Sequence, residues 1–276
     1  MRYLFGFLCV CALGAVPLLG CGETSSDRCQ GVTCDDDKVC TEDACNPANG
    51  TCDFTPVGDG TACADGACLR GDCTTLITVS GIVNVIDRSP PPVNATVSVL
   101  GTSLSTTTNE RGDYSFGAFA GDWVLQASQE GTWGEVAPVT VPSPGPFDIH
   151  FAVFTDATIA ELSDMLPIDI DDTKGWVSLN FEAASGEGGE TATLSEPYLG
   201  AWTWDAEEDK VVLSDALLPG SANGLDFMNV ELTEELTVTP KGVDGVNSCE
   251  LTNPDSVYLV MAKFFVGVDV SCTPVP

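Results

Sequence analysis

Histidine and basic side chains are scarce in this sequence. It has one histidine, His150, and ten lysine and arginine residues against 41 aspartates and glutamates, so its net charge is −31. Nucleic-acid binding requires basic side chains that neutralise phosphates, and this charge excludes it. Ser-His-Asp or Cys-His catalysis requires a histidine near a nucleophile, whereas His150 lies in an alternating, strand-like stretch. No glycine-rich phosphate loop precedes a helix. The sequence predicts a protein that is not an enzyme.

The N-terminal segment indicates export. Arg2 supplies a positive charge, and the run from Tyr3 to Leu19 is apolar and uncharged. A membrane-spanning helix needs about 20 apolar residues, so this shorter run is typical of a signal peptide. Its end, Leu18-Leu19-Gly20-Cys21, resembles the lipobox of bacterial lipoproteins, in which the cysteine is acylated and becomes the first residue of the mature chain.

This resemblance implies a signal peptide over residues 1–20, a lipid on Cys21 and a polar tether over residues 21–28. Glycine stands at position 22, where the inner-membrane retention signal of the family would place aspartate. We therefore expect the outer membrane or cell surface as the location, with the lipid anchor as the membrane contact. Each buried methylene contributes about 0.8 kcal/mol, so two or three acyl chains hold a protein durably. An ordinary secretory signal that leaves Cys21 as a free thiol is the alternative.

Ten further cysteines form two clusters in the expected mature chain. The first comprises Cys29, Cys34, Cys40, Cys45, Cys52, Cys63, Cys68 and Cys73, and the second comprises Cys249 and Cys272. Because each cluster of an exported chain holds an even number of cysteines, we predict four disulfides in the first cluster and one in the second. Residues 29–75 have hardly any aliphatic core, so the disulfides of this Cys-rich module substitute for one. The sequence does not determine which of the eight cysteines of this module pair with one another. Zinc is disfavoured because the spacings are long and no histidine lies nearby.

Residues 76–155 alternate as short strands between turns, which predicts a β-sandwich. The expected strands are Leu76–Val85, Thr96–Leu100, Leu104–Thr108, Tyr114–Ala118, Trp123–Ser128, Ala137–Val141 and Phe147–Val153. Within them Tyr114, Phe116, Trp123, Leu125 and Ala127 recur at period two and should face one core. Pro90-Pro91-Pro92 must form a loop.

A family resemblance rests on four runs within these residues. They are Gly81-Ile82-Val83, Ala95 to Val99, Thr106 to Phe116 with its Thr-x-x-x-Gly-x-Tyr-x-Phe pattern, and Gly121 to Ala127. Together they resemble a carboxypeptidase regulatory-like domain. The resemblance implies a transthyretin-like β-sandwich that is non-catalytic and acts as a folding aid, spacer or binding module.

Residues 156–276 form the most acidic region, with 23 acidic and 4 basic residues. Ile159, Leu162 and Leu166 recur at helical spacing behind Thr155-Asp156 as a possible N-cap, so we expect a short helix that covers one end of a sandwich, with a linker as the alternative. From Gly175 the alternation returns and predicts a second β-sandwich. The expected strands begin at Gly175 and continue over Thr191–Leu194, Ala201–Trp204, Val211–Leu213, Leu225–Leu232, Glu235–Pro240 and Val257–Val270.

Calcium is the one cofactor with candidate ligands. Carboxylates cluster at Asp35-Asp36-Asp37 and at Asp169, Asp171 and Asp172. However, Lys174 stands where an EF-hand requires glycine, and solvated acidic turns explain both clusters. We therefore expect no bound cofactor and keep calcium as the alternative.

Two further patterns have both a binding and a structural interpretation. Trp202 and Trp204, at positions i and i+2, would form a sugar-stacking face if both were exposed, and core residues otherwise. Arg70-Gly71-Asp72, between two cysteines, matches integrin-binding tripeptides, but a Gly-Asp turn is what such a loop requires anyway.

The sequence thus predicts a mostly β protein with two β-sandwich domains behind a small disulfide-rich module. We expect a surface lipoprotein that acts as a non-catalytic binding, adhesion or spacer protein with an unidentified protein or glycan ligand. A secreted carbohydrate-active hydrolase, or its carbohydrate-binding accessory, is the alternative. An open groove with converging carboxylates or aromatics would favour that alternative.

Overall fold

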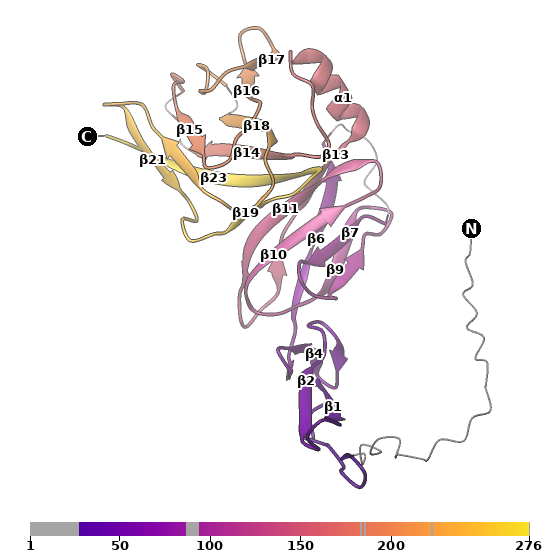
Figure 1. The fold of residues 1–276 in the computed structure, drawn as a ribbon. Helices are drawn as coiled ribbons and strands as arrows, with labels where there is room; N and C mark the ends of the chain where they lie inside the picture. The colour runs from indigo at the N-terminus through magenta and orange to yellow at the C-terminus, as the bar shows by residue number, and fades with distance from the viewer. Residues whose placement is uncertain (1–27, 87–93, 183, 185, 222, 276) are drawn as a thin grey trace, which may run out of the picture.

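The structure, a computed structural model, describes residues 28–86, 94–182, 184, 186–221 and 223–275. The expected signal peptide, Cys21, nearly all of the expected tether and Pro90-Pro91-Pro92, where a loop was expected, lie outside these residues. The described chain is mostly β with one helix, which confirms the expected fold class. Figure 1 shows the Cys-rich module at one end, followed by a first lobe and then a second lobe. No helix among the described residues is long and apolar enough to cross a membrane.

The Cys-rich module consists of two small sheets held by four disulfides. Its strands are β1 (Thr41–Cys45), β2 (Cys52–Pro56), β3 (Ala62–Cys63), β4 (Gly66–Leu69) and β5 (Asp72–Thr74). The disulfides join Cys29 to Cys45, Cys34 to Cys52, Cys40 to Cys68, and Cys63 to Cys73. Only the Cys40–Cys68 disulfide connects the two sheets, because β1 pairs with β2 and β4 lies between β3 and β5.

The module is docked on the first lobe. Ala67 is buried and belongs to the core of that lobe, and Leu69 packs against the same core. The backbone N–H of Ser103 donates to the carbonyl oxygen of Asp59 at 2.9 Å, across the junction. The module and the first lobe are therefore joined by a shared core and a backbone hydrogen bond as well as by the chain.

The first lobe is a β-sandwich. Its strands are β6 (Ile77–Val85), β7 (Thr96–Val99), β8 (Ser105–Thr107), β9 (Asp113–Ala118), β10 (Gly121–Ser128), β11 (Thr132–Val141), β12 (Phe147–Asp148) and β13 (Phe151–Thr155). One layer has the order β8-β7-β10-β11, and the other pairs β6 with β9, β12 and β13. All five residues of the period-two pattern, Tyr114, Phe116, Trp123, Leu125 and Ala127, pack into one core, as expected from the sequence.

The expected strand Phe147–Val153 is wrong as one element, because it breaks between β12 and β13. Gly81 lies so close to this break that a Cβ atom there would be 1.8 Å from the carbonyl oxygen of Ile149. The hydroxyl of Tyr114 donates to that oxygen at 2.6 Å, and the N–H of Ile82 donates to Nδ1 of His150 at 3.1 Å. These bonds fix a kink that alternation alone does not reveal.

The two lobes share one sheet. The first half of β11 pairs in parallel with β23 (Phe264–Pro274), the last strand of the chain, through Gly134 to Val136 and Phe264 to Val266. This pairing, together with the antiparallel pairing of Thr132 and Trp133 with β13, explains why β11 begins at Thr132 rather than at the expected Ala137. The strand order continues as β11-β23-β14-β18-β16-β17 into the second lobe.

The second lobe adds one helix and further strands, some in the shared sheet and some in two separate strand pairs. They are α1 (Asp156–Met165), β14 (Gly175–Glu182), β15 (Thr191–Leu194), β16 (Gly200–Asp205), β17 (Lys210–Leu213), β18 (Gly224–Val230), β19 (Thr233–Leu236), β20 (Val238–Lys241), β21 (Asn247–Leu251) and β22 (Tyr258–Val260). The helix begins behind Thr155, whose hydroxyl accepts from the N–H of Thr158 at 3.1 Å, so the expected N-cap is confirmed. The expected strands Glu235–Pro240 and Val257–Val270 are each divided, and β21 was not expected.

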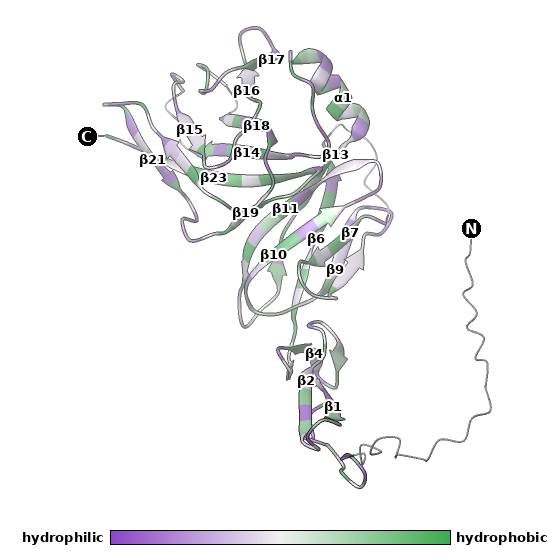
Figure 2. Cartoon of the chain, viewed as in Figure 1, coloured by the Kyte–Doolittle hydropathy of each residue, from purple (hydrophilic) through white to green (hydrophobic). Residues whose placement is uncertain are grey.

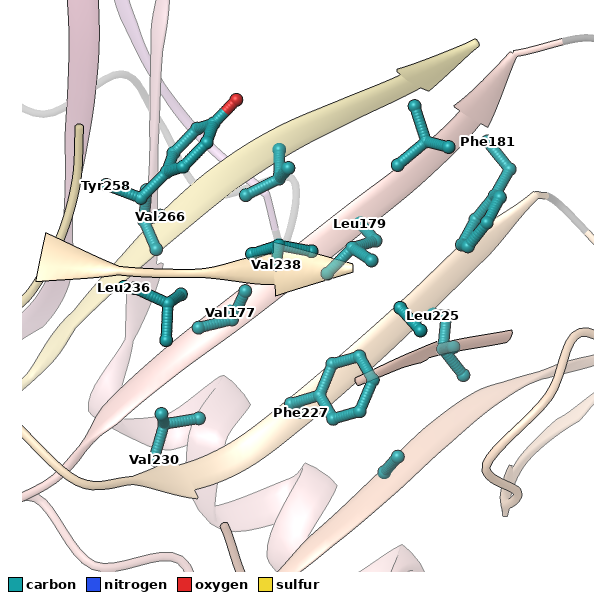
Figure 3. Packing of buried hydrophobic residues seen from close by; sticks show 14 of the residues in the cluster. Val177, Leu179, Phe181, Leu225, Phe227, Val230, Leu236, Val238, Tyr258 and Val266 are labelled. Carbon is teal, nitrogen blue, oxygen red and sulfur yellow. The ribbon is translucent and has the colours of Figure 1, made fainter. Parts of the chain in front are cut away.

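The shared sheet is covered on both faces in the second lobe. One face carries a core that includes Val177, Leu179, Phe227, Val266 and Val238, beneath the pairs β15–β20 and β19–β22. Figure 3 shows these side chains from β14, β18 and β20 directed toward one another, and Figure 2 shows the green, hydrophobic residues along β14 and β23. We call this the strand-covered core.

The opposite face carries the helix-covered core. It contains Trp133, Trp176, Met228 and Phe265 from the sheet, with Ile159, Leu162 and Leu166 from α1 and its C-terminal boundary. The helix therefore covers a face of the sheet, and the expectation that it covers one end of a sandwich is wrong.

Candidate binding groove

A groove of about 700 Å³ lies where the cover over the shared sheet stops. The pair β19–β22 covers the sheet as far as β11, and the loop Thr252–Val257 leads into β22. Beyond this loop the outer face of the β10–β11 hairpin has no covering layer among the described residues. The lining residues are Leu100, Asp122, Trp123, Val124, Pro138, Val139, Thr140, and Thr252 to Val257.

The floor of the groove is apolar. Val124 of β10 lies opposite Pro138 of β11 in the antiparallel register, and both share the outer face of the hairpin with the buried Val136. Val257 forms the opposite wall and exposes 52% of its surface. Apolar side chains left this exposed beside a hollow are available to pack against a ligand.

Two carboxylates stand at the polar part of the lining. Asp122 lies opposite Thr140 in the register and accepts from its hydroxyl at 2.6 Å, while Asp255 is exposed on the loop. No lysine, arginine or histidine is among the lining residues. The groove therefore combines an apolar floor with negative charge only.

Trp123 and Val139 also line the groove, although they lie on the inner face of the hairpin. The Trp123 ring packs on Phe119 with centroids 5.6 Å apart, and its indole N–H donates to the carbonyl oxygen of Ala120 at 3.4 Å. Trp123 is thereby held as part of the wall. It does not present a free aromatic face across the groove floor.

The candidate calcium ligands Asp169, Asp171 and Asp172 lie around a second hollow of about 750 Å³, together with Asp156 and Asp164 of α1. Sequence reasoning did not predict that α1 contributes to it. Within the described residues no three of these carboxylates approach one another within 4.8 Å, and Asp156 pairs with Lys263 at 2.8 Å.

The loop beside this hollow is held by its own hydrogen bonds. The Asp171 carboxylate accepts from the Thr173 hydroxyl at 2.7 Å and from its N–H at 2.8 Å, and these bonds lower the pKa of Asp171. Asn229, at a bulge in β18 with φ of 54°, accepts from the N–H of Asp171 and donates to the carbonyl oxygen of Asp169. Asp171 is thus already engaged within the protein.

We expect calcium to act on this protein only as a screening ion. At matched ionic strength, NaCl and CaCl₂ should raise the melting temperature similarly, because both reduce self-repulsion among the acidic side chains. Thermal unfolding of the whole protein in each salt measures this. A specific site would add about 2.7 kcal/mol at a hundredfold excess of calcium over its Kd. A large rise that saturates at low millimolar CaCl₂ and disappears in Asp171→Ala would contradict the expectation.

Asp35-Asp36-Asp37 form a capped turn. The N–H of Asp37 donates to the Asp35 carboxylate at 2.8 Å, and the N–H of Lys38 donates to the Asp36 carboxylate at 3.0 Å. The described residues contain one group of three close metal-ligating atoms, the sulfurs of Cys40, Cys63 and Cys73. All three belong to disulfides and offer no thiolate to a metal.

The two tryptophans of β16 do not form a paired exposed face. Trp202 packs against the helix-covered core, 6.1 Å from the ring of Trp176, whereas Trp204 exposes 38% of its surface. Nδ1 of His150 accepts from the N–H of Ile82, and Nε2 of His150 lies 3.4 Å from the Asp148 carboxylate. Arg70 and Gly71 occupy the two turn positions between β4 and β5, both with positive φ, which agrees with the turn interpretation.

No protein-family model and no curated protein matches the sequence. Among solved structures, the chain is similar to an N-terminal interface mutant of a type II cohesin–X-dockerin complex from Acetivibrio cellulolyticus, with 20% identity, 33% of this chain and 74% of that chain covered, and a TM-score of 0.26. It is similar to the shaft pilin SpaA from Lactobacillus rhamnosus GG, with 9% identity, coverage of 73% and 100%, and a TM-score of 0.25. It is also similar to the Bacillus anthracis TIE protein, with 11% identity, 80% of this chain and 41% of that chain covered, and a TM-score of 0.24. At these scores the similarities carry no functional argument.

Proposed function

We propose that this chain is a lipid-anchored surface protein that binds or spaces other molecules without catalysis. The observation that carries the proposal is the end-to-end order of its parts. Figure 1 shows the Cys-rich module at one end of the described chain, before the two lobes, and the residues that line the open groove all belong to the lobes. A module that precedes the lobes and is docked on them would hold the groove away from a membrane anchored at Cys21.

The chemistry of the described side chains supports a non-catalytic role. The groove carries Asp122 and Asp255 but no histidine, cysteine or lysine that would act as nucleophile or base partner. The Asp122 carboxylate is bonded to Thr140, and Asp255 projects from the loop on the other side. The expected anchor at Cys21 and the resemblance of residues 76–155 to carboxypeptidase regulatory-like domains support the same role.

Anchoring is tested on protein from the native host. Mass spectrometry should find an acylated Cys21 as the first residue, and the protein should fractionate with the outer membrane. The variant Cys21→Ser should lose the lipid and appear outside the membrane fraction, because two or three acyl chains supply the membrane affinity. An unmodified N-terminus on a soluble mature chain would contradict the proposal.

A further inference from the structure

We infer that the groove between the β10–β11 hairpin and the loop Thr252–Val257 binds an extended peptide segment of a partner protein, one that carries both apolar and basic side chains. The inference rests on the proposed binding function and names the ligand class. A groove of about 700 Å³ is within the usual range for a specific ligand site. Residues 122–124 of β10 and 138–140 of β11, which pair in antiparallel register, line the groove, so an extended ligand lying along the strand pair would contact both strands.

The floor of the groove offers apolar surface to a ligand. Val124 and Pro138 form a cross-strand pair, with Leu100 beside them and Val257 facing them from the loop. Val124 is only partly buried against the strand-covered core, so its remaining surface faces the hollow. Removing apolar surface from water is favourable roughly in proportion to the area buried, so apolar side chains in the ligand would supply much of the affinity.

Asp122 and Asp255 supply the charge of the groove. Both are exposed and both line the groove, and no lysine or arginine among the described residues lines it. Every lysine of the chain forms an ion pair elsewhere. These pairs are Lys38–Asp72, Lys174–Glu231, Lys210–Glu208, Lys241–Asp244 and Lys263–Asp156. Within the described part of the chain no cation therefore neutralises the two carboxylates in the groove, and a basic ligand would supply the complementary charge.

The charge of the whole chain decides between possible occupants. A second copy would bring another net charge of −31 and would be repelled, and the same field disfavours nucleic acid and anionic lipid headgroups. A neutral glycan is left as the competitor. Sugar recognition usually relies on an open aromatic face, and here the Trp123 ring packs on Phe119. A peptide with both basic and apolar side chains complements the apolar floor and the carboxylates of Asp122 and Asp255.

The test measures binding of a fluorescent peptide of four Lys-Val repeats to the whole protein purified in detergent. The variant Asp122→Asn/Asp255→Asn should weaken binding about tenfold, because two exposed charge pairs together contribute about 1.4 kcal/mol. Val257→Ser should weaken it about as much through lost apolar contact. Glu110→Gln/Glu130→Gln, which removes two exposed charges outside the groove, should stay within about twofold, the small change expected from the altered net charge alone.

The controls separate this inference from non-specific attraction. A Lys-Ser peptide of equal charge should bind more weakly, and a Glu-Val peptide should not bind. Equal weakening by the two double variants, or no detectable binding of the Lys-Val peptide, would overturn the inference. The inference would also be overturned if a neutral oligosaccharide bound in a way that depends on Asp122 and Asp255, while binding of the peptide did not depend on them. The measurement does not depend on the lipid at Cys21, so failure of the groove and failure of anchoring are distinguishable.

Discussion

The protein should be more stable toward urea at pH 4.5 than at pH 7.5. Asp226 of β18 is buried beneath Trp176, whose indole N–H donates to its carboxylate at 2.7 Å. Burial raises the pKa of Asp226 from 3.8 to about 6, against the opposing effect of the hydrogen bonds from Ser178 and Trp176. Glu135 of β11 has the same tendency, since burial raises its pKa from 4.5 to about 7.

The direction in which the free energy of unfolding changes with pH follows from proton binding. Between pH 4 and pH 6 the folded protein holds a proton on Asp226 that the unfolded chain has released, so the free energy of unfolding falls as the pH rises. The stabilisation is fully present below about pH 4 and is lost by about pH 6 for Asp226 and about pH 7 for Glu135. At 1.36 kcal/mol per pH unit, Asp226 alone accounts for about 3 kcal/mol.

Urea titrations from pH 4 to pH 8 measure this profile. The variant Asp226→Asn keeps an acceptor for the indole N–H of Trp176 but cannot ionise, so the slope between pH 4 and pH 6 should become shallower by the Asp226 contribution, while the contribution of Glu135 remains. Glu207→Gln, at an exposed acidic residue, should leave the slope almost unchanged. A stability that is flat or increases from pH 4.5 to pH 7.5 would show that the buried carboxyls are not protonated as inferred.

Gly81→Ala should destabilise the protein by more than about 3 kcal/mol, or prevent folding, while Gly267→Ala should not destabilise it. A Cβ at Gly81 would lie 1.8 Å from the carbonyl oxygen of Ile149, a backbone atom that cannot rotate away. Relief would require the β12–β13 kink to move and its bonds to Tyr114 and His150 to break, with unpaired polar groups as the result.

Gly267 is a matched control because it also lies within a strand and its φ is not positive. The nearest atom to its Cβ position is Oε1 of Glu135 at 3.9 Å, an ordinary contact. Alanine there should be neutral or stabilise by up to about 1 kcal/mol through the unfolded chain. Urea denaturation followed by tryptophan fluorescence gives both values. Similar stability for the two variants would mean that the kink is not held as described.

The strands that the sequence predicted are those whose two faces differ in polarity. Thr191–Leu194 has the expected bounds, and the Tyr114 and Leu125 faces meet in the expected core. A period of two reports which residues of one strand share a face, but it says nothing of the neighbouring strand. The residues of β11 and β23 therefore do not indicate that these two strands pair in parallel.

The groove was not predicted for the same reason. Its residues come from positions 100, 122–124, 138–140 and 252–257, and no motif joins them. Pro138 is the one hint, because proline inside a strand indicates an unpaired edge or an interrupted sheet. Sequence reasoning did locate Asp169, Asp171 and Asp172 on a loop, but the contribution of α1 to their surroundings depends on the helix lying on the sheet face.

The position of β23 has a consequence for the order in which the chain can fold. The four disulfides of the Cys-rich module join cysteines that are close in sequence, so this part can mature as soon as it emerges from the ribosome or a translocation pore. The sheet that unites the lobes cannot close at that stage, because β23 is synthesised last and supplies a neighbour to both β11 and β14. Until then the first half of β11 presents an open strand edge. Shielding of that edge by a chaperone would matter most during the final seconds of synthesis.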